Sequence, residues 1–487
     1  MNSHVRISVT DRARCLIDGT WTSCDSAPIP SFDPSDGALV GEFTVADEVG
    51  CSAAMAAART SFDEGSWSHA PRLRASVLLD YATRIERAKG ELAALLSAEN
   101  GKLLHDAEHE VAAGVSELRY YGGLARNIFG RVTEIEPGLI AMLAREPLGV
   151  AAIIVPWNAP VTLLVRSLAP ALAAGCTVVI KAHPEAALVT TRLVALLAED
   201  GRIPRGVINL IHETGSEHAQ SLVTSPLVDV VSYTGSTVVG KKIMAAAAGT
   251  LKRLNLELGG SAPCIVCADA NLDAAVAGVV RAGISHSGQV CVAASRILVH
   301  VDVCATFSAK LVAALRAIQV GSPRDHHSQM GPLINRRARD RIISLATEAA
   351  GSGEILIAPR VPEGLPSGGH YLTPGLAAIP DSRSALLQDE IFGPLLTIST
   401  FVDDEDALAR ANYSRFGLAA SVWTSDLKAG QRLAARLQAG TVWINQHLRM
   451  HAEIETGGFK ESGLGRLHGI EGLEAFLQTK HISWTTN

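Results

Sequence analysis

Short apolar runs, each followed by turn residues and a helix-like segment, alternate along most of this chain. One series comprises Val150–Val155, Thr177–Lys181, Val207–Ile211 and Val228–Tyr233. A second series begins after about residue 260 and comprises Cys264–Cys267, Arg296–Val301, Leu395–Phe401 and Ala420–Trp423. Continuous apolar runs of this length are typical of strands buried on both faces, and helices between them favour parallel crossovers. The pattern predicts an α/β fold with two doubly wound units.

Residues 68–127 predict a helical layer instead. Their apolar side chains recur at three- and four-residue steps, at Leu73, Val77, Leu78, Tyr81 and Ile85. A chain of 487 residues exceeds what one hydrophobic core usually organises, so we expect more than one subdomain. No internal repeat or flexible linker separates the units, and Pro362–Gly369 predicts an exposed loop.

Charge and hydropathy exclude several classes of partner. A net charge of −6 without clustered basic residues predicts that nucleic acid is not bound, and Lys241-Lys242 and Arg336-Arg337 are interpreted as solvated helix faces. Apolar runs stop short of the roughly eighteen residues of a membrane helix, and residues 1–6 lack the apolar core of a signal peptide. Eight scattered cysteines fit reduced thiols. We therefore expect a cytoplasmic protein without a membrane partner.

The segment Ser232–Lys242 reads as a strand, a Gly-Ser turn and the start of a helix. Such a turn directs backbone N–H groups and the positive end of a helix dipole toward an anion. It departs from a P-loop, because Lys242 occupies the place of the hydroxyl residue that holds Mg²⁺. Dinucleotide pyrophosphate binding and a turn chosen only for packing are equally good interpretations.

Three further features carry possible chemistry. The spacing of Cys264 and Cys267 suggests a metal, but no second ligand pair is near in sequence, so core cysteines are favoured and no metal is expected. Cys291 lies among small and polar residues, as an accessible nucleophile or an inert core thiol, with His286 as a candidate base or a surface residue. Glu257 stands among leucines, either as a buried general base or as a solvent-facing strand end.

Taken together, these segments resemble the aldehyde dehydrogenase superfamily, in its NAD(P)-dependent, non-acylating branch. The matching motifs occur in the family order and span nearly the whole chain, as Pro156–Pro160, Leu256–Gly260, Gly288–Cys291, Glu390–Pro394, Gly440–Asn445 and Gly457–Arg466. The resemblance implies a Rossmann-like cofactor domain, a catalytic α/β domain and a β oligomerisation arm. Their expected boundaries are 1–124 with 148–259, then 260–465, and 125–147 with 466–487.

The arm implies self-association. Its terminal strand, His481–Trp484, would add to the edge of a partner's sheet, so a homodimer or homotetramer is expected.

The resemblance also implies a mechanism. Cys291 attacks a small-molecule aldehyde, and the resulting oxyanion is stabilised by the Asn158 amide and the Cys291 backbone N–H. Hydride transfer to the nicotinamide leaves a thioester, which water activated by Glu257 hydrolyses. A glutamate at this position favours water over coenzyme A as the acyl acceptor. A hydrolase or acyltransferase using Cys291 with His286 is the alternative class.

Cofactor contacts are expected from Trp157, Lys181, Gly235, Ser236, Glu390 and Phe392. Members of the family that prefer NAD often place a glutamate three residues after the lysine, where it binds the ribose hydroxyls and repels a 2′-phosphate. This chain has Pro184 there, with Glu185 one place later. Both NAD and NADP therefore remain open as the cofactor.

The residues expected to line the substrate pocket are Ala159, Thr162, Leu163, Arg166, Ser285, Val290, Val292, Met450 and Thr456. Arg166 has two interpretations. It pairs with the remote carboxylate of an acidic semialdehyde, or it is structural, as in aromatic-aldehyde oxidisers that carry Arg-Ser at positions 166 and 167. The loop with His447, Arg449, His451, Glu453 and Glu455 departs from the family near the pocket mouth.

Overall fold

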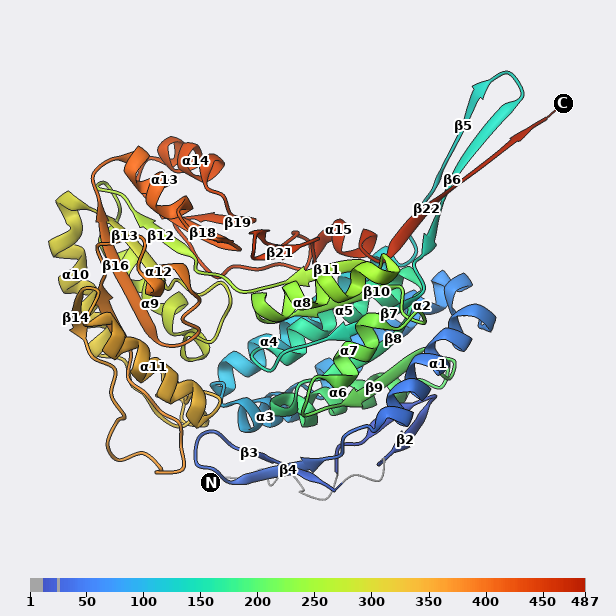
Figure 1. Cartoon of the computed structure of the whole chain (residues 1–487), viewed down its shortest axis with the longest axis horizontal. Helices are drawn as coiled ribbons and strands as arrows, with labels where there is room; N and C mark the ends of the chain where they lie inside the picture. The colour runs from blue at the N-terminus through green and yellow to red at the C-terminus, as the bar shows by residue number, and fades with distance from the viewer. Residues whose placement is uncertain (1–11, 24–26, 487) are drawn as a thin grey trace.

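The computed structural model describes residues 12–23 and 27–486 (Figure 1). Residues 1–6, on which the signal-peptide expectation rests, lie outside them. The first sheet has the strand order β2-β1-β9-β8-β7-β10-β11-β21. Its parallel centre comprises β9 (Ile208–His212), β8 (Thr177–Ala182), β7 (Val150–Ile154), β10 (Val230–Thr234) and β11 (Arg253–Glu257). Antiparallel edges are formed by β1 (Cys15–Ile17), β2 (Thr20–Thr22) and β21 (Gly463–Leu464). The first predicted series of strands is confirmed.

Both faces of this sheet are covered by helices. In β7, Val150 and Ala152 belong to one apolar cluster and Ala151 and Ile153 to another, because successive side chains of a strand point to opposite faces. The first cluster includes side chains of α1 (Glu48–Glu64), α7 (Glu217–Thr224) and α8 (Thr237–Ala247). The second includes α5 (Pro160–Ala174) and α6 (Ala187–Ala198). Burial on both sides explains why the run has no polar alternation.

The predicted helical layer is also confirmed. It consists of α2 (Pro71–Arg87), α3 (Lys89–Asn100) and α4 (Leu104–Leu124). Val77, Leu78, Tyr81 and Ile85 on α2 are fully buried in the same cluster as α5. The periodic face of α2 therefore packs against the first sheet's helical cover.

A second sheet of order β14-β15-β16-β13-β12-β18-β19 forms a separate unit (Figure 1). Four of its strands match the second predicted series, namely β12 (Pro263–Val266), β13 (Arg296–His300), β16 (Leu395–Phe401) and β18 (Ala419–Trp423). The sequence pattern missed the short flanking strands β14 (Glu354–Ile357), β15 (Gly375–Ala378) and β19 (Thr441–Ile444). All neighbours in this sheet are parallel except β14 and β15. The mixed α/β class with two doubly wound units is confirmed.

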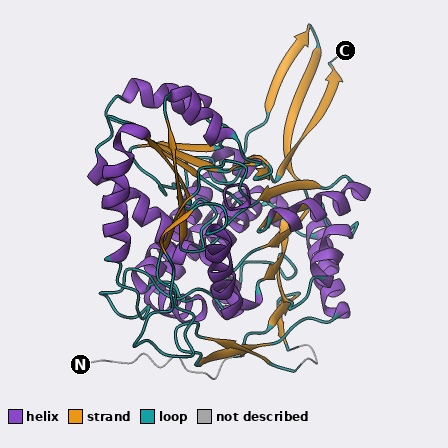
Figure 2. Ribbon diagram, turned by 60° about the vertical axis from the view of Figure 1, so that its left-hand side comes forward, coloured by secondary structure: helices purple, strands orange, loops and turns teal. Residues whose placement is uncertain are grey.

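A three-stranded sheet projects away from both units (Figures 1 and 2). It contains β5 (Arg131–Glu136), β6 (Leu139–Pro147) and β22 (Leu477–Thr485). The terminal strand is longer than expected and pairs with β6 from Leu477 to Thr485. The exact division of the chain into domains stays a prediction, and β21 joins the first sheet although its residues fall in the range assigned to the second unit.

In the part of the chain that the structure describes, no helix has the length and apolarity needed to cross a bilayer. The segment Pro362–Gly369 has no regular structure and is largely exposed, as predicted.

Candidate active site

Four parallel strands of the first sheet end at the same edge. Trp157 and Asn158 follow β7, Lys181 lies near the end of β8, Gly235 follows β10, and Glu257 ends β11. Ligands of open α/β sheets bind at the carboxyl edge of the strands. In this structure that edge borders a cavity of about 1070 Å³.

The second sheet supplies the opposite wall of the cavity. Cys291 lies between α9 (Leu272–Ile284) and β13, and Glu390 lies between α12 (Ala385–Gln388) and β16. Since β13 and β16 are adjacent and parallel, the segments that enter them lie side by side. Every predicted catalytic and cofactor-binding residue lines this one cavity: Trp157, Asn158, Lys181, Gly235, Ser236, Glu257, Cys291, Glu390 and Phe392.

Asn158 connects the two walls. Its Nδ2 donates a hydrogen bond to the carbonyl oxygen of Gln289 at 3.0 Å, and the backbone carbonyl oxygen of Asn158 accepts one from Lys102 Nζ at 3.0 Å. The side chain is buried. The hydrogen bond to Gln289, two positions before Cys291 in the sequence, therefore holds the side-chain amide beside the segment that carries Cys291. The second N–H of the amide is available to a ligand.

Cys291 is half-buried against the strand end that carries Glu257. A Cβ atom at Gly260 would lie 2.4 Å from the Cys291 carbonyl oxygen, so only glycine allows this approach. Burial raises the pKa of the Cys291 thiol to about 12, Glu390 and Glu257 add to the rise, and Arg166 opposes it. The thiol is thus protonated at neutral pH.

Glu257 is buried, with 5% of its surface exposed, so the solvent-facing interpretation is wrong. Its Oε1 has no hydrogen-bond partner among the described residues, and its Oε2 lies 3.8 Å from Arg166 Nη2. Burial raises the pKa of this carboxyl, while Arg166, His468 and Arg466 lower it. A buried carboxyl with a free lone pair toward a cavity suits proton abstraction.

Glu390 faces the same strand end. Its Oε1 accepts a hydrogen bond from the Gly260 N–H at 3.1 Å, and burial raises its pKa to about 7. Phe392 has a φ of 51°, a region that non-glycine residues rarely adopt, and its ring meets Trp157 edge to face at 5.8 Å. A strained backbone at this point positions an aromatic ring on the cavity wall.

The remaining cofactor candidates lie around the N-terminal ends of helices. Ser236 caps α8 by accepting a hydrogen bond from Val239 N–H, and a Cβ atom at Gly235 would lie 2.2 Å from Tyr233 Oη. Lys181 Nζ lies 3.4 Å from Glu213 Oε2, and both side chains are buried. The Gly-Ser turn is therefore both close-packed and open to the cavity, as a dinucleotide site requires.

Pro184, at the position expected to distinguish NAD from NADP, begins a short 3₁₀ turn, Pro184–Ala186. Glu185 accepts a hydrogen bond from the Asn335 side chain. The Glu185 carboxylate is thus occupied by this hydrogen bond.

The residues predicted to contact substrate have a different placement. Of the nine residues predicted to contact substrate, Leu163 alone lines the cavity. Ala159, Thr162 and Arg166 lie at the start and middle of α5, whereas Met450 is exposed. The others are Ser285, Val290 and Val292 around Cys291, and Thr456, which bridges to Leu467. Their contact with substrate stays a prediction.

The unusual loop after β19 is partly buried. His447 is fully buried, and its Nε2 lies 2.7 Å from the Val292 carbonyl oxygen and its Nδ1 2.8 Å from Ser421 Oγ. Glu455 Oε1 accepts a hydrogen bond from the Ile470 N–H at 2.9 Å, in the first turn of α15 (Gly469–Glu474). These two side chains hold the loop in place.

Sequence reasoning missed several polar residues of the cavity. Lys242 and Arg337, interpreted as solvated helix faces, are exposed on α8 and α11 (Arg336–Ala349), yet both line the cavity, as do His183 and Arg341. The signal for Lys242 was its place in the turn segment; nothing local marked the arginines, which come from the second unit.

Two alternative sites lose support. His286 is buried, neither of its ring nitrogens has a hydrogen-bond partner among the described residues, and it does not line the cavity. Burial lowers its pKa well below the usual value. Cys264 is a core residue whose Sγ accepts a hydrogen bond from Trp423 Nε1 at 3.1 Å.

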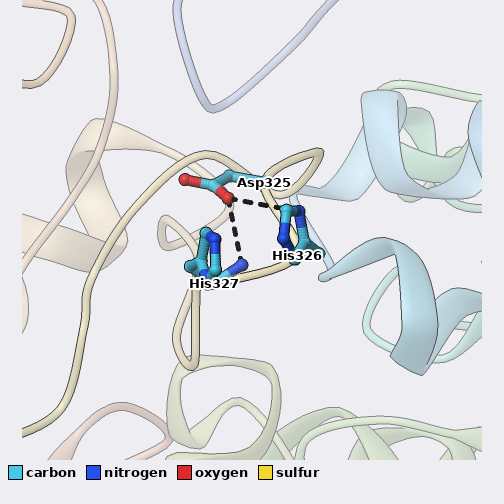
Figure 3. Close-up of side chains that lie close together, drawn as sticks. All are labelled: Asp325, His326 and His327. Carbon is cyan, nitrogen blue, oxygen red and sulfur yellow. Dashed lines mark hydrogen bonds and ion pairs between the residues drawn. The ribbon is translucent and has the colours of Figure 1, made fainter.

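Within the described ranges, one group of side chains lies close enough to share a metal ion: Asp325, His326 and His327 (Figure 3). All are exposed, on the loop between α10 (Val301–Arg316) and α11. Asp325 accepts a hydrogen bond from the His327 N–H at 3.0 Å, which closes a local turn. None of them lines the cavity, so they contribute nothing to its chemistry.

Comparison with known proteins adds a family. Residues 21–482 match the model of the "Aldehyde dehydrogenase family". The chain is 37% identical over 477 residues to betaine aldehyde dehydrogenase of Bacillus subtilis, covering 96% of each chain. It is 36% identical to succinate-semialdehyde dehydrogenase of Paenarthrobacter nicotinovorans, covering 91% of this chain and 98% of that one. The solved structure of Staphylococcus aureus betaine aldehyde dehydrogenase in complex with NAD⁺ superposes with a TM-score of 0.95 at 34% identity, covering 98% of this chain and 95% of that one.

Proposed function

This chain belongs to the aldehyde dehydrogenase family, and we propose that it oxidises an aldehyde to the carboxylic acid through a thioester on Cys291. As an NAD(P)-dependent aldehyde dehydrogenase it needs a nucleophile, an oxyanion donor and a general base at the dinucleotide site. The observation that carries the proposal is that Cys291, Asn158 and Glu257 line the same cavity as Lys181 and the Gly235-Ser236 turn.

The first step is addition of the Cys291 sulfur to the aldehyde carbonyl. The carbonyl oxygen gains negative charge as the C–S bond forms, and the thiol proton passes to a water molecule in the cavity. One Asn158 N–H is held by the Gln289 carbonyl, so the amide plane is fixed and its other N–H is free to donate to the oxyanion. The Cys291 backbone N–H is the second donor.

The cavity fits a nicotinamide dinucleotide. The close-packed Gly235 and the capped start of α8 form an anion-binding turn, and Lys181, held by the buried Glu213, offers a charge-assisted contact to a ribose. Glu390 stands at the other end beside Gly260. When bound, NAD⁺ or NADP⁺ accepts the hydride that leaves the adduct.

Glu257 then removes a proton from water as the water oxygen attacks the thioester carbon. The C–S bond breaks with its electron pair on sulfur, the thiol is restored and the acid is released. Burial makes Glu257 a stronger base than a surface glutamate, and its unpaired Oε1 is the atom free to bind the water.

We propose that NADP⁺ is accepted as well as NAD⁺. Pro184 places no carboxylate where one would repel a 2′-phosphate, and Glu185 is held by Asn335. The cavity is also bordered by the cations Lys181, Lys242 and Arg337.

Of the two substrate subtypes, we propose an aromatic aldehyde over an acidic semialdehyde. Arg166 donates a hydrogen bond to Thr234 Oγ1 at 3.0 Å and lies 3.8 Å from Glu257, so its guanidinium is engaged by the protein. The test compares kcat/KM for matched aromatic and carboxylate-bearing aldehydes with each cofactor. A higher kcat/KM for the carboxylate-bearing aldehydes would contradict the proposed preference for aromatic substrates.

The decisive experiment replaces the nucleophile. Cys291→Ala is expected to abolish NAD(P)H formation from aldehyde while leaving dinucleotide binding, measured by fluorescence titration, intact. Cys304→Ser, at a half-buried thiol on α10, is the matched control and keeps activity. A hydrolase or acyltransferase would form no NAD(P)H with either protein, and turnover by Cys291→Ala would refute the nucleophile.

A further inference from the structure

Arg166 is a buried charge at the back of the proposed site. It lies on α5 with 4% of its surface exposed. Its Nη2 donates a hydrogen bond to Thr234 Oγ1 at 3.0 Å and lies 3.8 Å from Glu257 Oε2. Thr234 and Glu257 are direct partners in the parallel ladder of β10 and β11. One guanidinium therefore spans the carboxyl ends of two neighbouring strands.

Arg166 and Glu257 have few other polar partners. Arg166 Nε and Glu257 Oε1 are both buried without hydrogen-bond partners among the described residues. A buried charge that loses its partner is strongly unfavourable. Glu257 thus depends on Arg166 to stay ionised.

Two other charged side chains near Glu257 already form hydrogen bonds with other residues. His468 Nδ1 bonds to Glu117 Oε2 at 2.9 Å, and Arg466 Nη1 donates to the Gly465 carbonyl oxygen at 2.7 Å. On the facing wall, Glu390 is an acid and Cys291 is a neutral thiol, so neither brings a positive charge. Within the described chain, Arg166 is the cation at ion-pair distance from Glu257.

We propose that Arg166 is a positioning residue of this reaction: held by Thr234, its guanidinium is the fixed counter-charge that keeps Glu257 a carboxylate able to take a proton from water. The inference rests on the proposed general-base role of Glu257. It also assigns Arg166 to the protein's own base, and not to a carboxylate on the substrate.

The electrostatics of the site agree with this geometry. Burial raises the pKa of Glu257, and Arg166 is the largest influence that lowers it. A protonated Glu257 cannot accept a proton, so thioester hydrolysis fails as pH falls through the carboxyl pKa. Losing Arg166 raises that pKa and moves the failure to higher pH.

The test measures acyl-enzyme hydrolysis without a dinucleotide. The activated ester 4-nitrophenyl acetate acylates the Cys291 thiol, and steady release of nitrophenolate after the first turnover reports deacylation. The variants are Arg166→Met, Arg166→Gln and Arg166→Lys. Arg74→Met is the control, since Arg74 is equally buried and its hydrogen bonds within the described residues go to the carbonyl oxygens of Ala173, Trp67 and Ser68.

Arg166→Met and Arg166→Gln are expected to move the acid limb of the deacylation profile upward by about one to three pH units. Arg166→Lys retains the charge and keeps the limb near that of the parent. Arg74→Met lowers thermal stability and leaves the limb in place. If the methionine variant does not fold, the comparison of glutamine with lysine carries the same test.

The inference would be overturned by an unmoved acid limb in the neutral variants, by equal loss with lysine and methionine, or by failure of every Arg166 variant to fold, which leaves a structural role only. A rise in KM confined to acidic aldehydes would instead assign Arg166 to substrate and also overturn it. Glu257→Gln distinguishes failure of this inference from failure of the proposed general-base role. Undiminished deacylation in that variant would show that Glu257 is not the general base.

Discussion

Asn158 Nδ2 lies 3.0 Å from the carbonyl oxygen of Gln289, and this hydrogen bond joins the segment after β7 to the segment that carries Cys291. The proposed oxyanion donor and the proposed nucleophile come from different sheets, so neither is placed by its own strand alone. Their relative position depends on contacts between the two units. Rigid placement of this kind is what electrostatic stabilisation of a transition state requires.

Asn158→Ala should therefore lower kcat by about 10² to 10³. The loss arises because one oxyanion donor disappears and the nucleophile segment loses its tether. Steady-state kinetics and dinucleotide titration measure it, with dinucleotide affinity expected to hold. Asn209→Ala is the control, because Asn209 is a buried asparagine that bonds to the backbone of Asp18 and Gly206. A kcat equal to that of the parent would remove Asn158 from the mechanism.

Glu257→Gln should slow hydrolysis of the thioester more than hydride transfer. Glutamine keeps the shape of the side chain but cannot take a proton, so a pre-steady-state burst of NAD(P)H persists while steady turnover falls. Glu99→Gln is the control, since the buried Glu99 accepts hydrogen bonds from the N–H groups of Leu188 and Val189. Complete disappearance of the burst would place Glu257 before hydride transfer and contradict its assigned role.

The Cys291 thiol should be a poor nucleophile at neutral pH in the dinucleotide-free enzyme. Burial raises its pKa to about 12, so the thiolate fraction keeps growing as pH rises toward that value. The rate of alkylation by iodoacetamide is expected to increase about tenfold per pH unit above neutrality, without an early plateau. Measurement on a Cys267→Ser/Cys304→Ser background removes the two other half-buried thiols among the described residues. A plateau near pH 8.5, the approximate value for a free thiol, would show that burial does not control this group.

Replacing Pro184 with glutamate should disfavour NADP⁺ relative to NAD⁺. The new carboxylate would repel a 2′-phosphate and bind the hydroxyls of an unmodified ribose. Pro184→Gln is the matched control, with the same side-chain length and no charge. The ratio of kcat/KM values for the two cofactors is the measurement. If the glutamate and glutamine variants show the same ratio, position 184 does not read the 2′ group.

The projecting β sheet should mediate self-association. Ile482 and Trp484 alternate along the terminal strand β22, so they share one face, and both are substantially exposed. Replacing both with glutamate is expected to give a smaller species in sedimentation velocity, because burying two carboxylates in an interface is unfavourable. Ser483→Glu, on the opposite face, is the control. An unchanged sedimentation coefficient in the double variant would exclude this face from the interface.

Local patterns were sufficient for the interior of the fold. Runs such as Val150–Val155 and Leu395–Phe401 became central strands, because burial on both faces leaves a continuous apolar signature. Short flanking strands such as β14 and β19 were not predicted, because four residues at the edge of a sheet carry little pattern of their own. The motif residues converge on one cavity, whereas Arg337 and Arg341 reach it only because the second unit folds against the first.

The sequence by itself determined the class of the fold, because periodicity is a local property, and the resemblance of its motifs to a known family led to the proposed roles of Cys291, Asn158 and Glu257. Only the tertiary structure decided which charge accompanies Glu257. That pairing requires the register of β10 against β11 and the packing of α5 behind them, so that Arg166 meets two strand ends at once. An ion pair between residues so distant in sequence depends on three-dimensional packing, which no local pattern encodes.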